Sequence, residues 1–194
     1  MKRYLWIILI LSACSGMIPK KVVLDSSSDK KPEWVDSSKT TYEKDARIYF
    51  RSTYTARGSD RIDGCYDHAK LNGRATVLSE IATDLKGSLN QASESISEDA
   101  EDYLTKVQSG NYEGRVVGLR YSEEYFERYA IKDEERIACY VLGEMREVDY
   151  NAVKRTVIQK LTTIDSRLKD AVMDKNVDFF KKQLDRATAS EPKR

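Results

Sequence analysis

The chain has 194 residues, of which 40% are hydrophobic and 34% are charged, so it accommodates one domain with a modest core, a highly charged surface and tails. Its formal net charge is +1, from 33 basic and 32 acidic residues, and excluding Lys2 and Arg3 leaves 31 basic residues and a net charge of −1. This balance argues against a nucleic-acid-binding protein, which has a basic face or a basic excess, and it provides no polybasic patch for an anionic membrane surface.

Residues 1–13 have the pattern of a secretory signal peptide. A basic start precedes an apolar run over residues 4–11, which is too short for a membrane-spanning helix of about 20 residues. The stretch Leu11-Ser12-Ala13-Cys14 resembles a bacterial lipobox, a signal at which cleavage exposes a cysteine that receives lipid. We therefore expect Cys14 to carry acyl chains such as palmitate and to anchor the protein to a membrane. The alternative is an ordinary signal peptide with a chance cysteine.

The residues after the expected anchor indicate where the protein lies. In Gram-negative lipoproteins an Asp after the lipidated cysteine tends to retain the protein in the inner membrane. Ser15 stands there, so the resemblance points to the outer membrane with the domain facing the periplasm. Residues 14–31 are predicted to be the lipidated N-terminus and a flexible tether, because they hold a serine run and no sustained period. A short strand or docking patch at Val22-Val23-Leu24 is the alternative.

The folded domain is predicted to span residues 32–172. Residues 47–57 alternate between apolar and polar, which predicts a half-buried strand. Ser59 or Asp60 can cap the helix that follows. Three glycines weaken that helix where they fall inside it: Gly64, Gly73 and Gly87. Its apolar stripe, at spacings of three and four residues, consists of Leu71, Ala75, Leu78, Ala82, Leu85 and Leu89.

Residues 93–109 are rich in carboxylates and carry a thin apolar edge that can continue the helix. A carboxylate cluster raises the question of calcium binding. The calcium-loop pattern, with its glycine and regularly spaced oxygen ligands, is absent. We therefore favour a solvated acidic helix face.

After Gly110 the apolar period changes to two. Residues 117–131 and 137–145 are predicted to form a long antiparallel hairpin with a turn at Lys132-Asp133-Glu134. A second amphipathic helix is expected from about Asp149, with its stripe at Val153, Val157, Leu161, Ile164, Leu168 and Ala171. Residues 173–194 are predicted to be a short C-terminal helix and a tail.

The order strand, helix, strand, strand, helix predicts an α+β fold, with a small antiparallel sheet and helices packed on one face. Three tyrosines of the first hairpin strand, Tyr121, Tyr125 and Tyr129, share a parity. We expect them to form a contact strip, although the same parity can equally face the core.

Residues for enzyme chemistry are mostly missing. The chain has one histidine, His68, and no phosphate loop, dinucleotide fingerprint or nucleophile elbow. Cys65 and His68 are three residues apart and can form a thiolate pair, but no third group is identifiable and an exported thiol tends to be oxidised. We therefore predict no enzyme activity, no catalytic residue, no cofactor and no metal site.

Cysteine counting predicts a disulfide instead. If Cys14 carries lipid, two thiols remain, Cys65 and Cys139, and an oxidising periplasm favours joining them. Cys139 lies on the apolar side of its strand, and Cys65 begins the helix that should cover that side. Two buried free thiols that lie too far apart to bond are the alternative.

Four stretches together resemble the twenty-kilodalton bacterial outer-membrane lipoprotein family, a group that includes flagellum-associated lipoproteins. They are "PEWV" at 32–35, "IYF" at 48–50, "AKLNGRATVLSEIATDL" at 69–85 and "ACYVLGEMRE" at 138–147. The resemblance covers about residues 32–161 and implies a small α+β domain, an outer-membrane lipid anchor and no established catalytic site. Some relatives assemble into rings or disks around the flagellar motor. The acidic segment and the C-terminal extension depart from the family pattern, so no particular partner is implied.

These observations predict a structural or assembly lipoprotein of the cell envelope, associating with itself or with an envelope partner. The alternative is a periplasmic small-ligand or peptidoglycan-binding module, which requires a pocket with convergent polar groups. An enclosed apolar cavity would favour the alternative, whereas a solid core with an exposed strand edge would favour assembly.

Overall fold

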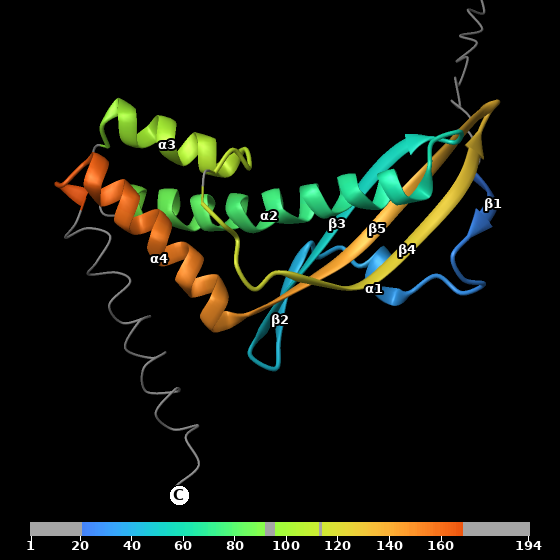
Figure 1. Ribbon diagram of the computed structural model, residues 1–194, viewed down its shortest axis with the longest axis horizontal. Coiled ribbons are helices and arrows are strands. Elements are labelled where there is room, and N and C mark those ends of the chain that lie inside the picture. Colours follow the sequence, from blue (N-terminus) through green and yellow to red (C-terminus); the bar gives the residue numbers. More distant parts are fainter. Residues whose placement is uncertain (1–20, 92–95, 113, 169–194) are drawn as a thin grey trace, which may run out of the picture.

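The computed structural model describes residues 21–91, 96–112 and 114–168, and its element order is shown in Figure 1. The strands are β1 (Lys21–Ser26), β2 (Thr41–Lys44), β3 (Arg47–Arg57), β4 (Arg120–Ile131) and β5 (Glu134–Arg146). They form one antiparallel sheet in the order β1-β4-β5-β3-β2. The helices are α1 (Glu33–Asp36), α2 (Ile62–Gln91), α3 (Glu98–Gln108) and α4 (Glu147–Ile164). The predicted α+β class and the antiparallel hairpin are confirmed.

The first half of α2 lies directly on one face of the sheet. Ser52 on β3 donates a hydrogen bond to the backbone carbonyl of Ala69, and Asn72 donates to the carbonyl of Thr53 at 2.8 Å. The second half of α2 packs with α3 and α4 beside the sheet (Figure 1). The main core lies there, with Phe50 and Met145 contributed from the strands and fully buried.

The chain's own N-terminal segment covers part of the opposite face. Neighbouring residues on a strand point to opposite faces, and Arg51, next to Ser52, donates from its guanidinium to the carbonyl of Val35. The Trp34 indole donates to the carboxylate of Glu123 at 2.6 Å, and Val35 is 2% exposed. The short helix α1 is therefore held against the face that α2 leaves open.

The apolar stripe of α2 begins earlier than predicted. Leu71 is 61% exposed, so its place in the predicted stripe is wrong. The residues that face the sheet in this half are Cys65, Ala69 and Gly73, which are all buried. Small residues allow the helix to approach the sheet closely, and this close contact determines which side of α2 is covered.

The start of α2 also differs from the predicted cap. The helix begins at Ile62, and its first backbone bond runs from Cys65 to the carbonyl of Arg61 at 3.1 Å. The carboxylate of Asp60 instead accepts a hydrogen bond from the backbone N–H of Arg57 at 3.1 Å. Asp60 therefore stabilises the turn out of β3 and does not cap the helix.

Helix α3 is separate from α2 and has a complete C-terminal cap. Gly110 adopts φ +81°, its N–H donates to Val107, and the N–H of Asn111 donates to Lys106, each at 3.0 Å. This is the Schellman arrangement, which favours glycine because of its positive φ. The acidic side chains at 98, 99, 101 and 102 lie on the exposed face of α3.

Helix α4 ends at Ile164, earlier than its apolar pattern suggests. Asp165 is 5% exposed and its carboxylate accepts the backbone N–H of Ser97 at 3.1 Å, at the start of α3. A hydrogen bond from Arg167 holds the pKa of Asp165 well below its ordinary value, against the opposing effect of desolvation. The end of α4 is thus set by a contact between helices. Ala171 and the predicted C-terminal helix lie outside the described residues.

Within the described residues, no helix combines the length and the apolar character needed to cross a bilayer.

Gly73 and Gly87 offer a matched test of the close contact between α2 and the sheet. A Cβ at Gly73 would lie 3.0 Å from the Tyr121 ring and 3.2 Å from the Ser52 hydroxyl, whereas a Cβ at Gly87 meets nothing within 4 Å. We expect Gly87→Ala to stabilise the fold by ~0.5–1 kcal/mol through helix propensity, and Gly73→Ala to destabilise it by ~1–3 kcal/mol through overpacking. Denaturant unfolding of both variants measures this, and equal stabilisation by the two would contradict the described contact.

Candidate interaction surface

Strand β1 forms an apolar edge of the sheet, with no further strand beyond it among the described residues. Val22, Val23 and Leu24 are 51%, 51% and 50% exposed. The pairing with β4 shifts between Val23 and Asp25, so Leu24 is the extra residue of a β-bulge. An edge strand also presents backbone N–H and C=O groups that its own sheet does not pair. β1 therefore offers both apolar side chains and hydrogen-bonding groups to a partner.

The other edge of the sheet is protected. Strand β2 has only four residues, and its Glu43 and Lys44 are exposed. The turn that follows uses Asp45 and Ala46 at φ 52° and 55°. Short, charged edges discourage pairing with another chain. The two edges thus differ in kind, and only β1 has the character of a contact strand.

The predicted tether over residues 14–31 is wrong for the part from Lys21 onward. Lys21–Ser26 pair with β4, and the N–H of Ser27 donates to the carbonyl of Phe126 at 3.2 Å. The backbone pairing with β4 holds this segment against the sheet. The structure instead has the short strand at Val22-Val23-Leu24 that was the alternative to the tether. Cys14 lies outside the described residues.

An ion cluster around the buried carboxylate of Glu127, with Lys21 and Lys31 as its partners, holds the N-terminal segment against the sheet. The Glu127 side chain is 6% exposed, contacts the Lys21 ammonium, and lies 3.2 Å from the Lys31 Nζ. The two ammonium groups also lie 4.3 Å and 5.7 Å from the ring centroids of Tyr129 and Tyr140. Burial by itself would raise the pKa of Glu127, but hydrogen bonds from both lysines outweigh it and hold that pKa below its ordinary value.

In the sequence, Glu127 lies between Tyr125 and Tyr129 at the same parity and so interrupts the apolar alternation of residues 117–131. A carboxylate at an inward position of a strand requires a cation on the same face, because an unpaired buried charge is costly. The interruption of the apolar alternation is the feature of the sequence that indicates a paired, buried carboxylate. The identity of the partners, from a segment about a hundred residues earlier, depended on the fold.

The three tyrosines expected to form a contact strip do not share a face. A β-bulge between Tyr121 and Glu123 reverses the parity of the strand. Tyr121 lies on the α2 face, where its hydroxyl donates to the carbonyl of Lys70 and where burial raises its pKa to about 12. Tyr125 and Tyr129 lie on the opposite face and are 3% and 9% exposed. The proposed strip is therefore wrong.

The structure brings Cys65 and Cys139 to disulfide distance. Their Sγ atoms are 2.07 Å apart and their Cα atoms 5.9 Å apart. Both cysteines are buried, and they pack with Ala69, Ile137 and Val141. A bond that closes a loop across 74 residues stabilises the fold by about 4 kcal/mol in the chain-entropy model. The alternative in which the two thiols lie too far apart does not hold.

The lone histidine does not pair with a thiolate. Cys65 is bonded to Cys139, and the His68 ring stacks on Tyr54 with 4.6 Å between centroids. In the described part of the chain, no group of three or more His, Cys, Asp or Glu side chains is placed to hold a metal ion.

A groove of about 530 Å³ lies between α3 and α4 and opens to solvent. Its lining combines aromatic and apolar groups, Tyr103, Tyr112 and Ile164, with the charged Lys106 and Lys160. An open groove of this kind is not the enclosed apolar cavity that would favour the small-ligand alternative.

The Glu127 cluster predicts a local response of the N-terminal segment. Glu127→Gln removes the charge that both lysines contact, and we expect amides of residues 21–36 to exchange roughly tenfold faster, equivalent to ~1–2 kcal/mol because the lysines are partly solvated. Lowering the pH should have the same effect: the pKa of Glu127 is depressed in the folded state, so its stabilisation is lost as pH falls through that lowered pKa.

Hydrogen exchange by mass spectrometry gives this readout, with α2 and α4 as internal references. Glu134→Gln is the control, because Glu134 and its partner Arg136 are exposed on the same hairpin. Unchanged exchange over residues 21–36 in Glu127→Gln would contradict the role of the cluster.

No family model, no curated protein and no solved structure matches this chain. The likeness to the twenty-kilodalton lipoproteins therefore stays a prediction from the residues that carry it.

Proposed function

We propose that this protein is a lipid-anchored structural protein of the bacterial outer membrane that faces the periplasm and assembles with further copies of itself through β1. The observation that carries the proposal is the apolar edge of the sheet at Val22-Val23-Leu24. Some members of the family that the chain resembles assemble around the flagellar motor, and a role near the flagellum is part of this proposal.

The position of β1 relative to the expected anchor supports this proposal. Lys21 follows Cys14 by seven residues, which span at most about 25 Å when fully extended. An anchored chain would therefore present β1 close to the bilayer. Copies confined to one membrane have a high effective concentration for one another, so weak edge contacts are sufficient for assembly.

The central position of the apolar triplet in β1 favours a second copy as the occupant. Lys21 begins the strand and Asp25 lies near its end, with the apolar triplet between them. Antiparallel pairing centred on Val23 places Val23 opposite Val23 of the second copy and aligns apolar with apolar residues. An antiparallel edge contact is thus self-complementary, as a two-fold interface requires.

Two further features agree with this proposal. A cysteine pair at disulfide distance suits an oxidising compartment such as the periplasm. The groove between α3 and α4 opens to solvent, so it does not supply the enclosed apolar cavity that would favour the alternative of a small-ligand or peptidoglycan-binding module.

The anchor is tested by the intact mass of the mature protein purified from membranes. We expect Cys14 as the N-terminal residue with acyl chains attached, and a mass lower by two hydrogens if Cys65 and Cys139 are bonded. Cys14→Ser should leave the precursor unprocessed or release the protein from the membrane fraction, because the lipid supplies the attachment. An unmodified N-terminus downstream of Cys14 would overturn the lipoprotein proposal.

The edge contact is tested by cysteine crosslinking in membranes. In the antiparallel register, Val23→Cys places two thiols opposite each other, within ~4.5–5.5 Å between Cα atoms. We expect oxidation to give roughly tenfold more dimer than Leu71→Cys, a control that is 61% exposed on α2. Equal yields from the two variants would rule out self-pairing through β1, whatever the outcome for the anchor.

A further inference from the structure

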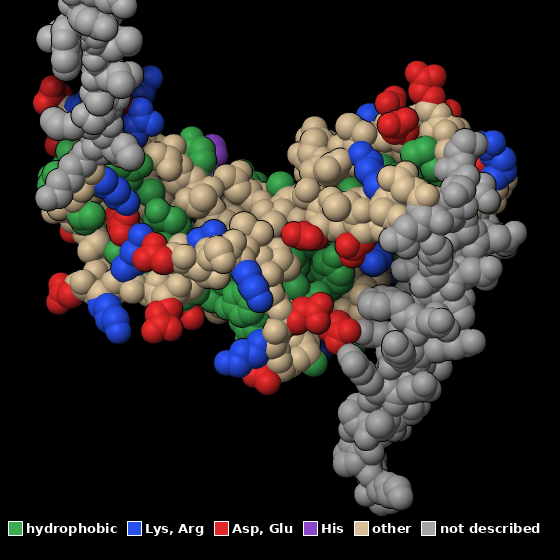
Figure 2. All heavy atoms as spheres, turned by 180° about the vertical axis from the view of Figure 1, so that it is seen from behind, with side chains coloured by type: hydrophobic (Ala, Val, Ile, Leu, Met, Phe, Trp, Pro, Cys, Tyr) green, Lys and Arg blue, Asp and Glu red, His purple; other side chains and the backbone are tan. Residues whose placement is uncertain are grey.

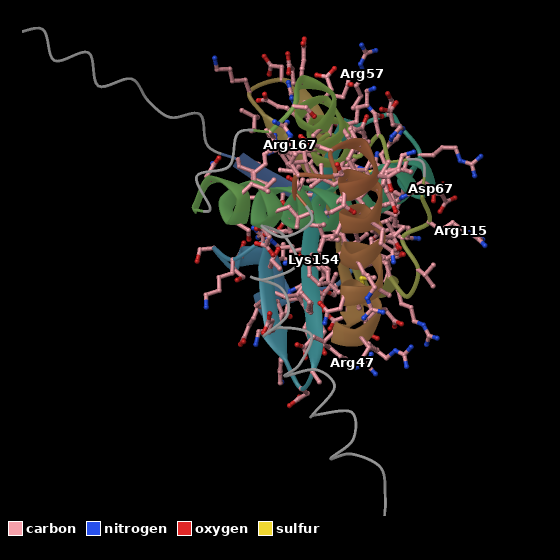
Figure 3. All side chains as sticks on the ribbon, turned by 90° about the vertical axis from the view of Figure 1, so that its left-hand side faces the viewer. Arg47, Arg57, Asp67, Arg115, Lys154 and Arg167 are labelled. Atoms are coloured by element: carbon pink, nitrogen blue, oxygen red, sulfur yellow. A yellow bond between two sulfur atoms is a disulfide. The ribbon has the colours of Figure 1, made fainter. Side chains whose placement is uncertain are left out.

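A small hollow of about 230 Å³ lies where α2, α4 and the β2–β3 hairpin meet. It is formed by residues remote from β1 and from the Glu127 cluster, so it is independent of the proposed assembly surface. Figure 2 shows hydrophobic side chains on this face with acidic ones beside them. Lys154 of α4, at one wall of the hollow, is labelled in Figure 3.

The hollow contains a buried polar group without a partner. Asn151 is 3% exposed, and neither its Oδ1 nor its Nδ2 has a hydrogen-bond partner among the described residues. Buried amides are almost always hydrogen-bonded, because leaving them unpaired is costly. Asn151 lines the hollow, so a ligand that enters with an N–H donor can supply the bond that Oδ1 lacks.

The rim of the hollow is acidic. Four carboxylates line it, from Glu43, Glu80, Asp84 and Glu147, and one ammonium, that of Lys154, lies 3.3 Å from Asp84. Carboxylates therefore outnumber ammonium groups among the residues that line the hollow. The carboxylate charge contributes to the raised pKa of Tyr150 at the wall: burial is the largest cause, followed by the charges of Asp84, Glu80 and Glu43.

The floor of the hollow is apolar. Ile48, Phe50 and Tyr150 line it and are 6%, 0% and 8% exposed. A group that carries a cation at the end of an apolar stem would contact this floor with the stem and the rim with the charge. The small volume fits one such group and not a drug-sized ligand.

We propose that this hollow binds a single cationic N–H donor, an ammonium or a guanidinium, carried on an apolar stem. Oδ1 of Asn151 accepts a hydrogen bond from it, and the carboxylates of Glu80 and Asp84 supply the attraction. The donor can belong to a free small amine or to a lysine or arginine side chain of a protein, since the recognised chemistry is the same.

The test titrates n-butylguanidinium chloride into the full chain and follows the side-chain amide of Asn151 by NMR. We expect a saturable shift of this resonance, and none with sodium chloride or n-butanol at the same concentrations, because both the charge and the stem are required. No saturable shift at Asn151 would overturn the proposal.

Matched variants separate binding from folding. Asn151→Leu keeps the size of the side chain and removes the acceptor, so we expect the protein to remain folded and the Kd, measured by calorimetry, to rise at least about tenfold. Glu80→Gln should weaken binding in the same direction. Asp102→Asn, which changes an exposed carboxylate on α3, should leave the Kd unchanged.

If Asn151→Leu fails to fold, Glu80→Gln against Asp102→Asn decides the question. Equal affinity in all variants would overturn the proposal. A capped Gly-Arg-Gly peptide distinguishes the two sources: tighter binding than n-butylguanidinium indicates a protein-borne arginine, and equal or weaker binding indicates a free amine. Either result supports the shared chemistry.

Discussion

The close approach of α2 to the sheet is the constraint on which the rest of the structure depends. Cys65, Ala69 and Gly73 bring the helix backbone against β3 and β5, where Ser52 bonds the helix directly and Cys139 lies at disulfide distance. With its first half held there, α2 extends past the sheet, and its second half becomes the surface on which α3 and α4 pack. The main core and the small cluster around the cysteines are both consequences of this contact.

The face opposite α2 is closed in a different way. No long helix covers it among the described residues, and the N-terminal segment crosses it instead, held by Glu127, Lys21, Lys31 and the backbone of Val35. The segment that would lead to a membrane anchor is therefore part of the fold. Because β1 is an edge strand of the sheet, the strand proposed for self-association is also the described segment that lies nearest in sequence to Cys14.

The two surfaces proposed to bind partners have opposite chemistry. The edge at β1 offers apolar side chains and backbone hydrogen bonds, which suit another strand. The hollow near Asn151 offers an acidic rim over an apolar floor, which suits a single cation. They are built from different elements, so occupation of one leaves the other accessible.

The sequence by itself determined the α+β class and the order of the main elements, because periods of 2 and 3.6 residues are local information. Cysteine counting favoured a bond between Cys65 and Cys139 but left open whether the two thiols meet. The tertiary structure alone decided the rest. A one-residue bulge near Tyr121 places this tyrosine on the opposite face of the sheet from Tyr125 and Tyr129. The close contact of α2 with the sheet leaves Leu71 exposed. The carboxylate of Asp165, directly after α4, accepts a hydrogen bond from Ser97. The hollow at Asn151 could not be predicted from the sequence either, because its rim, floor and buried amide come from elements that meet only in the folded chain. Such features depend on contacts between distant residues, and a single sequence without an alignment does not encode them as a local pattern.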